Sequence, residues 1–162
     1  MNGAPTRVLF VCLGNICRSP TAHGVFEAMV AARGLSEQIV VDSCGTGDWH
    51  VGRPPDARAA AAAAQRGCDL KHLRARQFRA SDFDDFDYIL AMDHNNLSDL
   101  TAAQVSGFNG QLRLLLDFAP EVTEREVPDP YYGEHDGFDR VLDLVELASA
   151  GLLREIVRAR AG

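Results

Sequence analysis

A cysteine and an arginine six positions apart are the residues whose types and spacing point most directly to chemistry. Cys12 begins the stretch Cys-Leu-Gly-Asn-Ile-Cys-Arg-Ser, and Arg18 stands next to its end. The guanidinium of an arginine is a planar fork that matches two oxygens of a phosphate group, and a cysteine thiolate is a nucleophile. The spacing therefore predicts a loop that holds an oxyanion beside a nucleophilic sulfur.

The residues around this stretch predict how it is positioned. Residues 8–11 are apolar and mostly suited to a buried strand, while Ser19 followed by Pro20 predicts a helix N-cap with proline at the first helical position. Backbone N–H groups converge at such a helix terminus, where the dipole is positive, and they favour an anion and the thiolate of Cys12. The alternative is a small buried cysteine at a strand end, with an arginine capping a nearby group.

Length and composition limit the class of protein. The chain has 162 residues, 46% hydrophobic and 24% charged, so we expect residues 1–162 to form one globular domain. No run approaches the ~18 apolar residues of a membrane span, and no signal-like segment opens the chain, so we expect no membrane span and a cytoplasmic location. A formal net charge of −7 argues against a nucleic-acid partner, whose phosphates must be neutralised.

The cysteine pattern predicts neither a disulfide scaffold nor a metal site. Four cysteines are few for a secreted disulfide scaffold of this length. We interpret Cys44 and Cys68 as buried side chains that pack in the core. Zinc ligation by the cysteines with any of the five histidines is not supported by CxxC or HxxxH spacing. We therefore expect no metal and no cofactor.

Strand and helix patterns alternate along the chain. Apolar residues at helical spacing predict a helix over 22–30 that ends near Gly34, with His23 and Glu27 on its solvated side. The remaining expected elements are strands at 39–41, 88–92 and 112–115 and helices at 57–64, 94–103 and 138–156. This order predicts an α/β fold: an open four-stranded parallel sheet flanked by helices on both faces, with the Cys12 loop at its ligand-binding end.

A proton donor must come from outside the loop. Displacing an alkoxide or phenoxide from phosphorus requires a proton for the leaving oxygen, and nothing in residues 12–19 supplies one. Asp129 lies between Pro128 and Pro130, which keep its backbone extended. By residue type alone it is one aspartate among many; Asp93, at a strand end, is another, and we interpret Asp93 as a helix cap.

The sequence resembles the low-molecular-weight protein tyrosine phosphatases. The resemblance rests on residues 11–20 (Val-Cys-Leu-Gly-Asn-Ile-Cys-Arg-Ser-Pro) and 129–132 (Asp-Pro-Tyr-Tyr), with His72 and the Ala-Arg-Gln of 75–77 as further landmarks. It implies the strand order 2-1-3-4. It also implies a protein tyrosine phosphatase that hydrolyses phosphotyrosine and small aryl phosphate monoesters through a cysteinyl-phosphate intermediate.

The resemblance also implies roles for individual residues. Cys12 is the nucleophile, Arg18 binds phosphate, and Asp129 protonates the leaving phenolate and then activates water. The residues expected to bind phosphate or support the loop are Leu13, Gly14, Asn15, Ile16, Cys17, Ser19, Ser43 and His72, with His72 helping to hold Asn15. Those expected to line a narrow apolar slot for a phenyl ring are Leu13, Trp49, Tyr131 and Tyr132. Without the resemblance, Trp49 is equally well interpreted as a core anchor.

A second cysteine in the loop suggests redox regulation. Cys17 lies five residues after Cys12, and we hypothesise that oxidation joins the two in a disulfide that inactivates the enzyme reversibly. The alternative is that Cys17 only packs the loop.

Three other functions are compatible with parts of the pattern. Thioredoxin-coupled arsenate reductases need two further cysteines near mid-chain, where only Cys68 lies. Protein-arginine phosphatases carry threonine where this chain has Ile16, and they lack the paired tyrosines. A non-catalytic phosphate-binding module would leave Asp129 without a role. The expected partners are phosphotyrosine-containing proteins and a cognate tyrosine kinase, and the expected state is a monomer or weak dimer.

Overall fold

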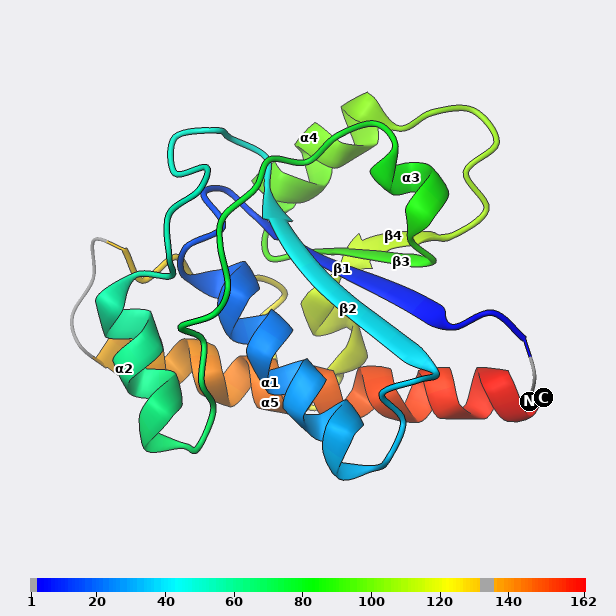
Figure 1. Ribbon diagram of the computed structural model, residues 1–162. Coiled ribbons are helices and arrows are strands. Elements are labelled where there is room, and N and C mark those ends of the chain that lie inside the picture. The colour runs from blue at the N-terminus through cyan, green and yellow to red at the C-terminus, as the bar shows by residue number, and fades with distance from the viewer. Residues whose placement is uncertain (1–2, 132–135) are drawn as a thin grey trace.

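A parallel sheet forms the centre of the computed structural model, which describes residues 3–131 and 136–162. The strands are β1 (Thr6–Cys12), β2 (Ile39–Gly45), β3 (Tyr88–Ala91) and β4 (Gln111–Leu114), in the order β2-β1-β3-β4 (Figure 1). All three pairings are parallel. The expected sheet and its strand order are confirmed.

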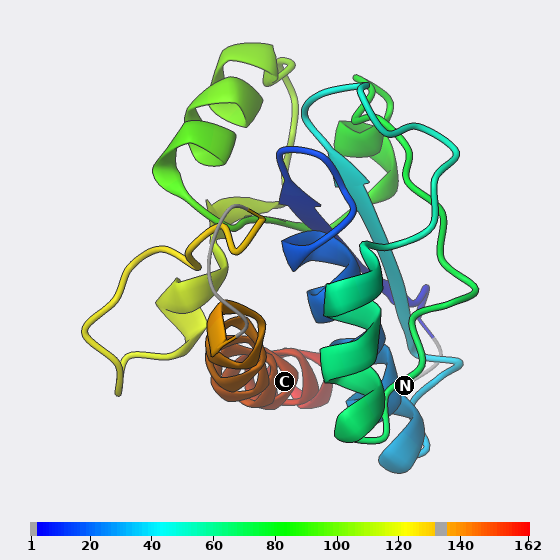
Figure 2. The same ribbon diagram turned by 90° about the vertical axis from the view of Figure 1, so that its left-hand side faces the viewer.

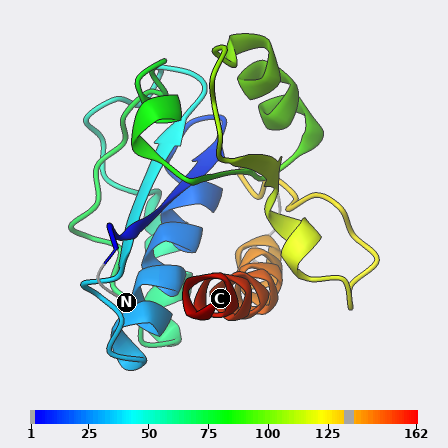
Figure 3. The same ribbon diagram turned by 90° about the vertical axis from the view of Figure 1, so that its right-hand side faces the viewer.

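Helices cover both faces of the sheet, as Figure 3 shows from the side of the chain termini. One face carries α1 (Arg18–Ala32), α2 (Ala57–Gln65) and α5 (Asp136–Ala161), and the other carries α3 (Asp82–Asp85) and α4 (His94–Ala103). A 3-10 turn, η1 (Leu115–Phe118), follows β4 and packs against α5.

The side chains of β1 explain why this strand is the centre of the fold. Val8 and Phe10 point into the core shared with α1 and α5, and Leu9 and Val11 point into the core shared with α3 and α4. All four are fully buried. A strand covered on both faces reads as a continuous apolar run, which is the pattern of residues 8–11.

Helix α1 begins at Arg18, so the expected N-cap at Ser19 is wrong. The N-cap residue is Cys17, and no side chain caps the helix. Ser19 Oγ is instead 2.7 Å from Asn15 Nδ2 and 3.1 Å from Cys12 Sγ. A side-chain cap would occupy the N–H groups of the first turn, which an anion-binding helix terminus needs to leave available.

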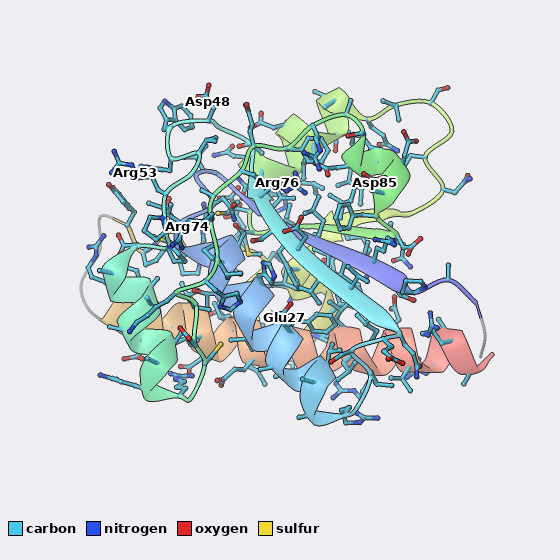
Figure 4. All side chains as sticks on the ribbon, in the orientation of Figure 1. Glu27, Asp48, Arg53, Arg74, Arg76 and Asp85 are labelled. Atoms are coloured by element: carbon cyan, nitrogen blue, oxygen red, sulfur yellow. The ribbon has the colours of Figure 1, made fainter. Side chains whose placement is uncertain are left out.

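The first half of α1 is enclosed on all sides, and this corrects the expected position of His23. His23 is 8% exposed, and its Nδ1 lies 2.9 Å from Ser43 Oγ on β2. Because a buried polar group needs a hydrogen-bond partner, this pair satisfies both side chains. Glu27, one turn further along, is exposed as expected (Figure 4).

Other expected features of the helices and cysteines are confirmed. Gly34 ends α1 with a φ of 68°, and Asp93 caps α4 by accepting a 2.8 Å hydrogen bond from the backbone of Asn96. Cys44 and Cys68 are buried free thiols.

Within the described residues, no helix is both long and apolar enough to cross a membrane.

Candidate active site

The loop between β1 and α1 curls tightly at the carboxyl end of the sheet, and Figure 2 looks onto this end of the molecule. Asn15 has a φ of 58°, in the left-handed region that asparagine tolerates better than most residues. Its side chain fixes the curl from both sides, since Nδ2 donates to Ser19 Oγ at 2.7 Å and Oδ1 accepts from the Arg76 backbone at 3.0 Å. The loop is therefore shaped before any anion binds.

The expectation that His72 holds Asn15 is wrong. The His72 side chain is 61% exposed, and its Nε2 lies 3.9 Å from Glu27 Oε1. The segment that reaches the loop is fixed by Arg76, whose guanidinium pairs with Asp42 at 3.1 Å and with Asp82 at 3.0 Å. Figure 4 shows Arg76 beside the end of β2 and Glu27 further along on α1.

The sulfur of Cys12 receives hydrogen bonds from the loop. The backbone N of Asn15 lies 3.3 Å from Sγ, and Ser19 Oγ lies 3.1 Å away. Because Ser19 Oγ already accepts from the Asn15 side chain, its own proton can point to Sγ or to the carbonyl of Cys44, 3.3 Å away. The loop thus points the Asn15 backbone N–H at the sulfur and places the Ser19 hydroxyl beside it.

Three contacts fix the guanidinium of Arg18, which is 3% exposed. Nη1 donates to Asp93 Oδ2 at 2.7 Å and to the carbonyl of Val127 at 3.1 Å. Nη2 lies 3.6 Å from Asp129 Oδ2. Asp93 was expected to act as a helix cap alone, and its contact with Arg18 was not predicted. The available signal was its position at the end of β3, next to β1 in the sheet.

A pocket of about 410 Å³ opens beside the loop and brings most of the expected site residues together. The lining residues are Cys12, Leu13, Gly14, Ile16, Cys17, Arg18, Trp49, His50, Asp129 and Tyr131. Leu13 and Trp49, 43% and 69% exposed, are the more open parts of its wall. Sequence reasoning missed His50, although it directly follows Trp49; its ring centroid lies 6.3 Å from that of Tyr131.

The remaining expected residues are Ser43 and Tyr132. Ser43 is on β2 and contacts His23, outside the set of residues that line the pocket. Tyr132 lies outside the described residues. Tyr131 is positioned by Arg58, whose Nη2 donates to the Tyr131 carbonyl at 3.0 Å and whose guanidinium lies 5.6 Å from the ring centroid.

Asp129 lines the same pocket as the loop residues. Its Oδ1 accepts a hydrogen bond from the Tyr131 backbone at 3.1 Å, while Oδ2 faces Arg18. The side chain is 41% exposed, so water and substrate can reach it. A nucleophilic sulfur, a fixed guanidinium and an accessible carboxyl thus surround one cavity.

A parallel α/β sheet with a cysteine and an arginine in the loop after its first strand is typical of the class of cysteine-dependent phosphatases. Residues 7–161 match the family model described as low molecular weight phosphotyrosine protein phosphatase, and the chain belongs to this family. The low molecular weight protein-tyrosine-phosphatase of Streptomyces coelicolor is 46% identical over 161 residues, which cover 96% of this chain and 98% of that protein.

Solved structures agree with the family assignment. A protein tyrosine phosphatase from Entamoeba histolytica superposes with a TM-score of 0.91 at 37% identity, covering 96% of this chain and 99% of that chain. The drosophila arginine phosphatase superposes with a TM-score of 0.86 at 33% identity, covering 92% and 96%. The fold alone therefore does not separate the two substrate classes, whereas the family model and the sequence relatives favour tyrosine.

Proposed function

We propose that the protein hydrolyses phosphotyrosine and small aryl phosphate monoesters, with residues 1–162 acting as one phosphatase domain. The observation that carries this proposal is the placement of Cys12, Arg18 and Asp129 around one pocket, with the Asn15 backbone N–H donating to the sulfur and the Ser19 hydroxyl 3.1 Å from it. Family membership supports the same activity.

The first step transfers the phosphoryl group to sulfur. The thiolate of Cys12 attacks phosphorus in line, the S–P bond forms, and the bond to the phenolic oxygen breaks. Asp129 gives its proton to the departing oxygen. Arg18 and the backbone N–H groups of residues 13–19 hold the equatorial oxygens in a preorganised cradle.

The second step releases phosphate. Asp129, now a carboxylate, takes a proton from water as the water oxygen attacks phosphorus, and the P–S bond breaks. Ser19 lies 3.1 Å from the sulfur, so its hydroxyl stabilises the thiolate as it leaves. The free enzyme is regenerated with a thiolate and a protonated Asp129, ready for the next substrate.

The walls of the pocket support an aryl substrate. Leu13, Trp49 and Tyr131 line it and present apolar and aromatic surface to a phenyl ring. A phosphoserine side chain is too short to bring its phosphate through such a slot to the sulfur. Ile16 also lines the pocket, which supports phosphotyrosine over phosphoarginine, since arginine phosphatases carry threonine there.

Turnover of p-nitrophenyl phosphate without added metal tests the proposal, with Cys12→Ser as the key variant. We expect the wild type to turn over and the variant to lose at least about 10³-fold in kcat. A binding module would show no turnover in the wild type. A metal phosphatase would lose activity to a chelator and keep it in Cys12→Ser.

A side-by-side comparison of three peptide substrates tests the specificity. We expect phosphotyrosine peptides to be hydrolysed and phosphoarginine and phosphoserine peptides to be poor substrates. Equal turnover of the phosphotyrosine and phosphoserine peptides would contradict the slot. The cytoplasmic location, the cognate kinase and the monomer or weak dimer stay predictions from the sequence.

A further inference from the structure

The chain segment that precedes Asp129 is attached to the end of β3. Val127 is fully buried, and its backbone N donates to the carbonyl of Met92 at 2.8 Å. The carbonyl of Val127 accepts from Arg18 Nη1 at 3.1 Å. The backbone two residues before Asp129 is thus joined both to the sheet and to the phosphate-binding arginine.

Glu126 adds a side-chain contact to this attachment. Its Oε2 accepts a 2.8 Å hydrogen bond from the backbone N of His94 and lies 3.0 Å from His94 Nδ1. His94 is the first residue of α4, where a backbone N–H has no partner within the helix and where the dipole favours a carboxylate. The hydrogen bonds from the His94 backbone and imidazole lower the pKa of Glu126 below its ordinary value.

The chain between Glu126 and Asp129 is too stiff to absorb a displacement. Pro128 fixes one φ angle in this segment, and Pro128 and Pro130 restrict Val127 and Asp129, the residues before them, to extended conformations. A shift of residue 126 relative to α4 would therefore move the carboxyl of Asp129 relative to Arg18, 3.6 Å away. Catalytic groups misplaced by about 1 Å lose much of their effect.

We propose that Glu126 is a positioning residue for the proton donor of this enzyme: its contact with the amino terminus of α4 sets where Asp129 stands over the pocket. The inference rests on the proposed function, because it gives Asp129 the role of acid. Neither Glu126 nor His94 lines the pocket, so both act on the reaction through the segment that carries Asp129.

A purely structural ion pair makes a different prediction. The side chains of His94 and Glu126 are 64% and 50% exposed, and exposed pairs contribute little to stability. Loss of such a pair would slow all substrates equally or not at all. Loss of correct proton donation instead slows a poor leaving group, such as phenolate, more than p-nitrophenolate, which departs with little help from an acid.

The experiment compares kcat/KM for phenyl phosphate and p-nitrophenyl phosphate, since kcat/KM reports the step in which the phenolate departs. In Glu126→Ala we expect kcat/KM to fall about five- to tenfold for phenyl phosphate and less than about twofold for p-nitrophenyl phosphate. His94→Ala keeps the backbone N–H and should show a smaller loss with the same preference. Glu126→Gln keeps the shape of the side chain and one hydrogen-bond acceptor. It is measured beside Glu126→Ala to exclude misfolding as the cause of a loss.

Glu146→Gln is the matched control, because Glu146 is a comparably exposed carboxylate, paired with Arg66 away from the pocket. Glu146→Gln should leave kcat/KM unchanged for both phenyl phosphate and p-nitrophenyl phosphate. Equal losses for the two substrates in the Glu126 variants, or values equal to those of the control, would overturn the positioning role while leaving the phosphatase activity intact. Wild-type turnover that survives in Cys12→Ser would overturn the proposed function, and the positioning role with it.

Discussion

Arg18 Nη1 lies 2.7 Å from Asp93 Oδ2, and the other oxygen of the same aspartate caps α4 by accepting from Asn96. One carboxylate therefore joins the phosphate-binding arginine to the end of β3 and the start of α4. Its charge compensates the buried guanidinium before any phosphate is bound. The orientation of Arg18 is thus built into the fold, which is the form of electrostatic stabilisation that requires no rearrangement during the reaction.

The two contacts of Asp93 can be separated by Asp93→Asn. The asparagine amide can keep an oxygen on only one side, so either orientation loses the contact with Arg18 or the cap. We expect kcat/KM for p-nitrophenyl phosphate to fall about 10- to 100-fold as Arg18 loses its fixed position. Asp93→Ala loses both contacts. It should lower the free energy of unfolding by about 1 kcal/mol more than Asp93→Asn does. Wild-type kinetics in Asp93→Ala would show that Arg18 is positioned without Asp93.

Asn15 offers a test of the strain stored in the loop. Both Asn15→Gly and Asn15→Ala remove the bonds to Ser19 and to the Arg76 backbone, so both should lose activity. Glycine adopts the φ of 58° without strain, whereas alanine does not. We expect the alanine variant to be less stable than the glycine variant by about 1 kcal/mol in urea unfolding. Equal stability of the two variants would mean that the loop relaxes to a negative φ.

Much of the fold was predictable because its signals are local. The apolar run at 8–11 and the helical spacing at 138–156 each describe one element and its buried side. The loop chemistry was equally local, since Cys12 and Arg18 lie within seven residues of each other. The strand order was different: it came from the family resemblance, because periodicity does not say which strands are neighbours.

Most of the errors concern contacts between distant segments, whereas the error at Ser19 concerns contacts within the loop. Ser19 has the residue type of an N-cap, but its hydroxyl serves Cys12 and Asn15. His23 has a position on α1 that a helical pattern assigns to solvent, yet α1 is enclosed at that turn. The contact of Asp93 with Arg18 joins residues 75 positions apart, and its only signal is the position of Asp93 at the end of a strand that neighbours β1 in the sheet.

Because His23 is buried and His72 is exposed, mutation of the two histidines should have effects of different size. His23→Ala removes the partner of the buried Ser43 hydroxyl, so we expect it to lower the free energy of unfolding by about 1–3 kcal/mol. His72→Ala removes an exposed side chain and should change stability by less than about 0.5 kcal/mol. Urea unfolding of the two variants checks this. A larger loss in His72→Ala would restore the role that the sequence analysis gave it.

Cys17 should be chemically inert toward alkylation at neutral pH. Its burial, together with the charge of Asp56, raises its pKa well above that of an ordinary thiol. A raised pKa means that the proton is kept to higher pH, and only the thiolate reacts. At pH 7, iodoacetamide should therefore modify Cys12 and leave Cys17 intact, as peptide mass spectrometry can show. Modification of Cys17 at a rate similar to that of Cys12 would contradict this protonation state.

The same pKa shift sets a pH dependence for the hypothesised disulfide. After peroxide converts Cys12 to a sulfenic acid, Cys17 must lose its proton to form the disulfide and release water. The fraction of enzyme that dithiothreitol can reactivate after a peroxide pulse should therefore rise from pH 7 to pH 9. Cys17→Ser should turn over normally, but its activity should not recover with dithiothreitol at either pH. Full recovery of activity in this variant would show that no Cys12–Cys17 disulfide protects the enzyme.

Gly151 lies within α5 where the helix meets η1, and its lack of a side chain is required by packing. A Cβ at this position would overlap the carbonyl oxygen of Phe118. Alanine gains about 1 kcal/mol of helix propensity over glycine, but overpacking against a backbone atom costs about 1–3 kcal/mol. Because η1 is held between β4 and α5, it has little room to withdraw, and we expect Gly151→Ala to be less stable than the wild type.

The control for this prediction is Gly137→Ala, also in α5. A Cβ there would meet Pro130 Cβ at 3.4 Å, an ordinary contact, so the propensity gain of up to about 1 kcal/mol should not be offset by a clash. Urea unfolding should thus move the two variants in opposite directions, or leave Gly137→Ala unchanged. A Gly151→Ala variant as stable as the wild type would mean that η1 can shift away from α5, and that the glycine reflects no packing constraint.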